Sequence, residues 1–419
     1  MRPPAGSLTP TRQTSMTSAS MKRTGRPSHR RLGLALGAVL ALLPLTGCQD
    51  AGFSVEPVDL ACPSQPGGPV TLAVGARANS AAPVLPPPIV DLVREAAKQS
   101  QTVSIVRVDG SPTVSFQGTF RTDAANDVAR TSELDQFVRD VQNRVAALRP
   151  KAPEADVLAA LGEAARITPA GGTVVLIDSG LQTTGQIRFQ DPGTFGADPS
   201  EFVTYLRARS LMPALADRSV VLVGLGNTAE PQPALDAGLR ARVTALWQTV
   251  VQAAGASCVE IVDTAAGRTS VDTDIPVTLV ALPSVPPFQP CGETVLRDGD
   301  TVGFLPDQAV FRDPVAARVT LQDLATLVIN GRQEVELIGT TATAGPSEEG
   351  RVQLSRQRAE AVKSVLVELG VPAERITTVG AGTSWPDRVP DLAPDGSLIP
   401  WAAAQNRSVI VRLSCPTTS

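Results

Sequence analysis

Apolar residues between positions 70 and 262 recur with two different periods. Short, continuous apolar runs predict strands buried on both faces, and longer stretches with apolar residues three or four positions apart predict amphipathic helices. The predicted strands are 70–74, 102–108, 173–177, 220–225 and 259–262, and the predicted helices are 89–99, 134–148, 156–167 and 235–254. Because helices alternate with buried strands, this region is predicted to form a doubly wound, largely parallel α/β sheet.

A second group of elements is predicted after residue 291. Short strands are expected at the start of 302–307 and at 334–339, 375–379 and 408–413, with helices at 315–327 and 354–369. Gly370 and Pro372 follow the second helix, where a C-cap and a helix breaker are typical. Two stretches rich in proline separate these regions from their surroundings. We therefore divide the chain into a leader and signal peptide at 1–47, a spacer at 48–69, an α/β domain at 70–283, a linker at 284–290 and an α+β domain at 291–415.

The leader carries the pattern of a secretory signal. Basic residues at 21–31 precede the apolar run Leu32–Leu45, which at about 14 residues suits a signal peptide and is short for a membrane-spanning helix. The run ends in Leu45-Thr46-Gly47-Cys48, which resembles the lipobox of bacterial lipoproteins. The resemblance implies that Cys48 is lipidated, so that the chain is anchored to a membrane by lipid and lies in the cell envelope, outside the cytoplasm. An ordinary secretory leader with a chance cysteine is the alternative.

Four further cysteines follow Cys48, namely Cys62, Cys258, Cys291 and Cys415. Four cysteines in an oxidising compartment predict two disulfides. We favour the pairs Cys62–Cys258 and Cys291–Cys415, because each pair then brackets one predicted domain. Buried free thiols are the alternative.

The composition restricts the possible chemistry. The only histidine, His29, lies in the leader, so the remaining chain lacks Ser-His-Asp triads, Cys-His pairs and histidine metal ligands. A formal net charge of -4 gives no electrostatic reason to expect nucleic acid as a partner. We find no Walker loop and no nucleophile elbow. We expect a binding or scaffolding protein with no cofactor and no metal, rather than an enzyme; a hydrolase with two carboxylates is a third hypothesis, for which no spacing nominates a pair.

The order of elements in residues 68–283 resembles a von Willebrand factor A-type domain. In that family a D-x-S-x-S loop after the first strand supplies metal ligands, but here the loop at 75–80 contains no carboxylate. Asp178 stands where a later acid of that metal site would fall, and alone it cannot hold a hard cation that requires several oxygen ligands. We therefore interpret Asp178 as a strand-end or capping residue. The domain is expected to be a degenerate relative that spaces the two ends of the chain or recruits an envelope protein.

The C-terminal region resembles the OmpA-like, peptidoglycan-associated domain over about residues 293–414. The segments that carry this resemblance are Leu354–Val362, Gly370–Pro372, Arg375–Ile376, Val379–Gly382 and Asn406–Val409. The resemblance implies a βαβ-type fold that grips the diamino acid of a peptidoglycan stem peptide. Such a ligand carries a carboxylate and an ammonium group close together, so its recognition requires a cation and an anion at a set separation.

The resemblance also implies the residues of the ligand site. Arg358 takes the position of the family's cation, whose guanidinium suits a carboxylate, and Thr341, Asn406 and Arg407 are further expected contacts. The family's acid is replaced by Ala342, and losing one charged hydrogen bond weakens binding by roughly ten- to a hundredfold.

Three questions about this site stay open. Glu348 or Glu349 is a hypothetical substitute for the missing acid. For Arg358 the alternative is a helix-surface residue paired with Glu360 or Glu374. Trp385 and Trp401 flank a Pro/Asp-rich insertion at 386–400, and they either pin that loop or cover the edge of the pocket.

Two functions follow from these expectations. The first is a tether, with lipid at Cys48 and peptidoglycan at the C-terminal domain. The second is an envelope scaffold in which peptidoglycan binding has been lost and protein partners bind instead. The alanine at position 342 is the feature that keeps the second function open.

Overall fold

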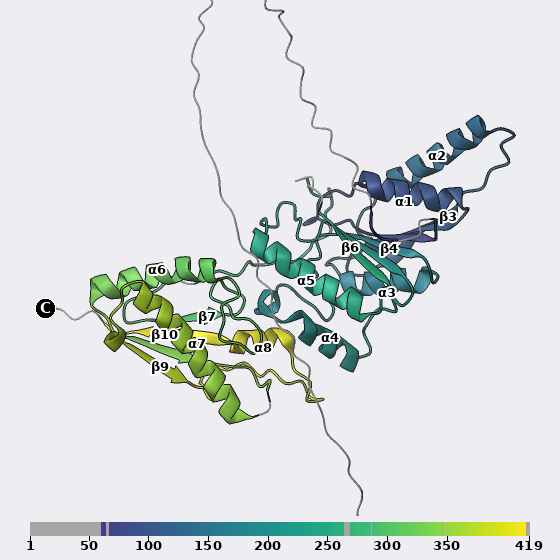
Figure 1. Ribbon diagram of the computed structural model, residues 1–419. Coiled ribbons are helices and arrows are strands. Elements are labelled where there is room, and N and C mark those ends of the chain that lie inside the picture. The colour runs from purple at the N-terminus through teal and green to yellow at the C-terminus, as the bar shows by residue number, and fades with distance from the viewer. Residues whose placement is uncertain (1–59, 64–66, 264–268, 286, 346, 416–419) are drawn as a thin grey trace, which may run out of the picture. The chain divides into compact units, whose positions relative to one another are not determined.

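The computed structural model describes residues 60–63, 67–263, 269–285, 287–345 and 347–415. These described residues belong to one compact unit that contains two β-sheets (Figure 1). The leader and Cys48 lie outside the described residues, so lipidation at Cys48 stays a prediction. Among the helices in the described ranges, none has both the length and the apolarity that crossing a bilayer requires.

The larger sheet has six strands in the order β3-β2-β1-β4-β5-β6. Its strands are β1 (Val70–Gly75), β2 (Thr102–Val108), β3 (Thr113–Thr119), β4 (Thr173–Ile177), β5 (Ser219–Val223) and β6 (Cys258–Val262). All neighbouring strands are parallel except β2 and β3, which form an antiparallel hairpin at one edge. Since the chain runs from β1 to β2 on one side and later continues with β4 on the other, the strand order reverses between β1 and β4. The doubly wound α/β fold is therefore confirmed.

Helices cover both faces of this sheet. One face packs against α1 (Pro87–Lys98) and α2 (Asp127–Ala146), and the other packs against α3 (Val157–Ile167), α4 (Pro199–Ala208) and α5 (Ala237–Ala253). Successive side chains of a strand point to opposite faces, which is why Leu72 and Val74 join the first core and Ala73 joins the second. We call this sheet and its helices the N-terminal module.

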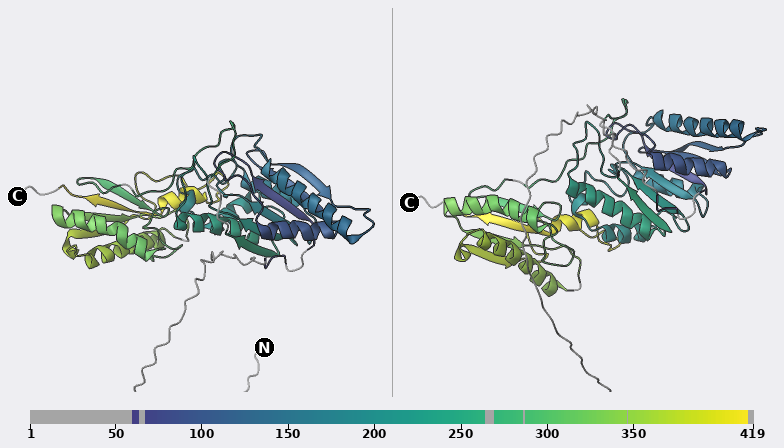
Figure 2. Two further views of the ribbon diagram at one scale, coloured as in Figure 1. Left: turned by 90° about the horizontal axis from the view of Figure 1, so that it is seen from above. Right: turned by 45° about the horizontal axis from the view of Figure 1, so that its top comes forward.

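The smaller sheet has four strands in the order β7-β10-β8-β9. Its elements are β7 (Glu293–Arg297), α6 (Pro314–Gly331), β8 (Val335–Gly339), α7 (Glu348–Glu368), a 3-10 turn (Ala373–Arg375), β9 (Ile376–Gly380), α8 (Pro400–Asn406) and β10 (Ser408–Leu413). Strand β10 is antiparallel to β7 and β8, whereas β8 and β9 are parallel and joined through α7. Helices α6 and α7 lie side by side and share one apolar core with the sheet (Figure 2). We call these elements the C-terminal module.

The structure corrects one predicted strand in the C-terminal module. No strand begins at 302–307; the first strand of this sheet is β7, and 302–307 is a loop with a single bridge between Phe304 and Phe311. Val302 and Phe304 of this loop are buried in the apolar core of the C-terminal module without pairing in a ladder, and the Phe304 ring stacks on Phe311 with centroids 4.8 Å apart. Helix α7 also begins six residues earlier than expected, because the Ser347 hydroxyl caps it by accepting from the Gly350 amide at 3.1 Å.

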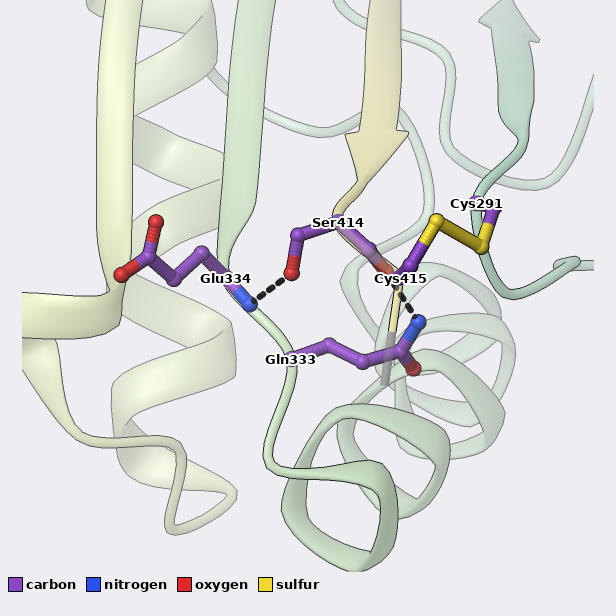
Figure 3. The surroundings of a disulfide bond; sticks show 5 residues. All are labelled: Cys291, Gln333, Glu334, Ser414 and Cys415. Carbon is purple, nitrogen blue, oxygen red and sulfur yellow. Dashed lines mark hydrogen bonds between the residues drawn. A yellow bond between two sulfur atoms is a disulfide. The ribbon is translucent and has the colours of Figure 1, made fainter. Parts of the chain in front are cut away.

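Two disulfides close the modules, in the pairing favoured from the sequence. Cys62 is joined to Cys258 at the start of β6, and Cys291 before β7 is joined to Cys415 after β10, with Cα separations of 5.9 and 4.3 Å. Figure 3 shows the second disulfide beside Ser414, whose hydroxyl accepts from the Glu334 amide at 2.8 Å. The last strand is therefore tied covalently to the first strand of its sheet and by hydrogen bonds to the start of β8.

Candidate functional site

A cavity of about 490 Å³ opens in the C-terminal module at the N-terminal half of α7. Its lining comes from the loop after β7, the loop after β8, helix α7 and the residue before β10: Asp307, Thr341, Ala342, Ala344, Gly345, Gly350, Arg351, Gln353, Leu354, Gln357, Arg358 and Arg407. Three of the four residues expected from the sequence, Thr341, Arg358 and Arg407, are thus brought together.

Arg358 is almost completely buried, with 1% of its surface exposed. Its Nε donates to the Gln308 carbonyl at 3.0 Å and its Nη2 to the Leu305 carbonyl at 3.5 Å, and its guanidinium carbon lies 5.3 Å from the Phe304 ring centroid. Burial lowers the pKa of the Arg358 guanidinium, and the negative charge of Asp298 opposes that shift. Arg358 is therefore not the exposed, carboxylate-paired residue of the alternative interpretation.

The other two guanidinium groups in the lining have carboxylate partners. Arg351 donates to Glu348 at 2.8 Å. Arg407 contacts both carboxylate oxygens of Glu201, which lies on α4 of the N-terminal module. Burial raises the pKa of Glu201 above its ordinary value even with the arginine beside it. Within the described ranges, Arg358 is the one of these three arginines without an ion-pair partner.

Another part of the cavity wall is formed by the loop after β8. Ala342 is buried and presents only a methyl group where the family carries its acid. The neighbouring Thr341 hydroxyl is buried and has no hydrogen-bond partner among the residues that the structure describes. An unpaired buried polar group is destabilising by about 1–3 kcal/mol, so a ligand atom that bonds this hydroxyl would be stabilised at the site.

Asn406, the fourth expected contact, lies outside the cavity lining. Its Nδ2 donates to the Val389 carbonyl at 2.7 Å and to Asp391 at 3.0 Å, and its Oδ1 accepts from the Val389 amide at 3.0 Å. The amide is thus occupied in holding the insertion 386–400. Trp401 packs on Phe202 and Tyr205 of α4 and likewise lies outside the lining, as does Trp385.

The two glutamates considered as substitutes for the missing acid do not line the cavity either. Glu348 accepts from Arg351 and from the Thr383 amide and hydroxyl, at 3.2 and 2.9 Å. The acid that does line the cavity is Asp307, which sequence reasoning missed. Its only sequence signal is the Pro306-Asp307 pair, which marks a turn but does not place that turn beside α7.

The N-terminal module has its own cavity of about 400 Å³ at the carboxyl ends of β1, β4 and β5. Open α/β sheets bind ligands at such an edge, where the strand order reverses. Asp178 lines this cavity and accepts from Arg77 Nη2 at 2.8 Å and from the Gly180 amide at 2.6 Å. Asp178 is therefore held in an ion pair with a fully buried arginine. In the part of the chain that the structure describes, no group of three acidic, cysteine or histidine residues is placed to hold a metal ion.

Part of the C-terminal region is similar to known proteins. Residues 304–390 match the model of the OmpA family. Solved structures similar to this region include the OmpA-like domain of FopA1 from Francisella tularensis subsp. tularensis SCHU S4, with 18% identity over 30% of this chain and 73% of that chain and a TM-score of 0.24. Another is the peptidoglycan-associated lipoprotein from Burkholderia pseudomallei, with 22% identity over 29% of this chain and 89% of that chain and a TM-score of 0.23. A third is the cell wall anchor of the T6SS from Pseudomonas aeruginosa, with 19% identity over 29% of this chain and 80% of that chain and a TM-score of 0.24.

One curated protein also matches part of this chain. The photosystem I P700 chlorophyll a apoprotein A2 of Gloeobacter violaceus is 33% identical over 121 residues. That match covers 26% of this chain and spans only 13% of the length of the relative.

Proposed function

We propose that this protein is a lipid-anchored protein of the cell envelope, outside the cytoplasm, whose C-terminal module binds peptidoglycan and thereby tethers membrane to wall. The observation that carries the proposal is Arg358, a buried guanidinium that lines a cavity and lacks an ion-pair partner in the described part of the chain. A buried cation is stabilised when a carboxylate binds it, and stem peptides of peptidoglycan carry free carboxylates. The match of residues 304–390 to the OmpA family and the two disulfides support this setting.

The test is cosedimentation of the full-length chain, kept in mild detergent, with purified sacculi. Arg358→Gln should reduce retention at least tenfold, because it removes a charged hydrogen-bond donor from the cavity. Arg356→Gln is the matched control, since Arg356 lies on the same helix, is exposed and is not part of the lining. Circular dichroism of both variants should show unchanged folding. Retention of Arg358→Gln at the level of the unchanged chain would refute the assignment.

The second candidate is an envelope scaffold that binds proteins and has lost peptidoglycan binding. The methyl group of Ala342 in the cavity wall favours it. In that case the unchanged chain would not be retained by sacculi, whereas Ala342→Asp should restore retention.

Two further parts of the proposal concern the rest of the chain. Membrane attachment through Cys48 is tested by mass spectrometry of the protein from its native membrane, which should find an acylated N-terminal cysteine. We also propose that residues 70–283 contact an envelope protein and that the chain binds rather than catalyses. Crosslinking in cells from exposed positions of the N-terminal module tests the first of these points.

A further inference from the structure

The loop that carries Asp307 is held directly by Arg358. The two carbonyl groups that accept from the guanidinium belong to Leu305 and Gln308, so they stand on either side of Asp307 in the chain. The loop is tight, because the Gln308 amide donates to the Leu305 carbonyl at 3.2 Å and Asp307 has a positive φ of 51°. The backbone on either side of Asp307 is therefore held by the buried cation.

Four charged side chains line the cavity, and two of them, Arg358 and Asp307, have no ion-pair partner in the described part of the chain. Arg351 and Arg407 are paired with Glu348 and Glu201, as described above. Asp307 is the one acidic residue of the lining. Within the described ranges its carboxylate has no hydrogen bond or ion pair. One cation, Arg358, and one anion, Asp307, thus line the same cavity without a direct ion pair, although the negative charges of Asp298 and Asp307 both act on the Arg358 guanidinium.

Building on the proposed function, we infer that Asp307 supplies the anionic half of the ligand grip that position 342 no longer provides. The ligand class is then a zwitterionic amino-acid head group, whose carboxylate is bound by Arg358 and whose ammonium faces Asp307. A simple carboxylate would place its charge near Asp307 without compensation, so it should bind more weakly. Asp307 is a specificity-determining residue in this scheme, and Ala342 contributes an apolar methyl group to the cavity wall.

The test compares two probes, meso-diaminopimelic acid and its di-N-acetyl derivative, by calorimetric or NMR titration of the full-length chain. The unchanged chain should bind the free amino acid about tenfold more tightly than the acetylated compound. Asp307→Asn should remove this preference by weakening the free amino acid about tenfold without weakening the acetylated one. Asparagine tolerates the positive φ at this position, so the variant should fold. Glu349→Gln is the control, because it removes the same charge from an exposed position outside the lining and should change nothing.

The outcomes separate the two claims. If Arg358→Gln abolishes binding of both probes but Asp307→Asn retains the preference for the free amino acid, the role of Asp307 is overturned while the proposed function stands. If the unchanged chain binds the two probes equally, the zwitterion specificity is likewise overturned. If it binds neither probe and is not retained by sacculi, the proposed function fails, and this inference fails with it.

Discussion

The buried ion pair between Arg77 and Asp178 lies at the carboxyl ends of the central strands β1 and β4. It leads to a specific prediction about the stability of the N-terminal module. Arg77 and Asp178 both have side chains with 0% exposure, and the carboxylate also accepts from the Gly180 amide at 2.6 Å. Asp178→Asn keeps the shape of the side chain but removes its charge, which leaves the guanidinium buried without an anion. Breaking a buried pair in this way is destabilising by about 3–5 kcal/mol. At about 2–4 °C per kcal/mol for a module of this size, the melting temperature should fall by roughly 6–20 °C.

The assay is thermal or urea unfolding of the full-length chain followed by tryptophan fluorescence. Trp247 reports on this edge directly, because its indole N–H donates to the Gly180 carbonyl at 2.8 Å. The companion variant combines Arg77→Met with Asp178→Asn and removes both charges. Replacing a buried pair by uncharged groups is often close to neutral, so the double variant should recover at least half of the lost stability. A loss below about 1 kcal/mol for Asp178→Asn, or a double variant no more stable than the single one, would refute the reasoning.

Four further predictions concern the two modules. Since the guanidinium already neutralises the carboxylate at the sheet edge, EDTA or millimolar Ca²⁺ or Mg²⁺ should leave the melting temperature unchanged, and a cation-dependent rise would contradict this account. Gly339→Ala should destabilise the C-terminal module by several kcal/mol, because a Cβ there would collide with the Ser355 backbone carbonyl; an unchanged urea midpoint would count against the packing of α7 on β8. Replacing Cys62 and Cys258 by serine should lower the free energy of unfolding by about 5 kcal/mol in the chain-entropy model, given their separation of 196 residues, and a loss under 1 kcal/mol would speak against that model here. Burial would raise the pKa of Asp391, but hydrogen bonds from its neighbours hold it below its ordinary value of 3.8. Its stabilising contribution is therefore present above that value and is lost as the pH falls below it through the folded pKa. Asp391→Asn should flatten the loss of stability below pH 3.8, and an identical acid profile would exclude this contribution.

Local patterns in the sequence were sufficient for most of the fold. The β-branched runs at 173–177 and 220–225 predicted parallel strands because strands covered on both faces are apolar throughout. The edge hairpin strand β3 was missed, since its exposed residues alternate with half-buried ones and give only a weak apolar signal. The loop at 302–307 was wrongly predicted to begin with a strand. Its apolar residues indicate that it is buried, but they do not indicate whether its backbone pairs with another strand.

For the candidate site, the sequence by itself nominated Arg358 as the ligand-binding cation, because the segment that resembles the OmpA-like family is local to one helix, and that role stays a prediction. Only the tertiary structure decided the groups around it: the burial of that guanidinium, the ion pair of Arg407 with Glu201 across 206 positions of the chain, and the arrival of Asp307 in the same cavity. The physical reason is the range of the interactions. Helix periodicity and capping depend on residues a few positions apart, so they can be recognised in the sequence. The pairing of charges in a cavity depends on which loops, distant in sequence, the packed core brings within a few ångströms of one another.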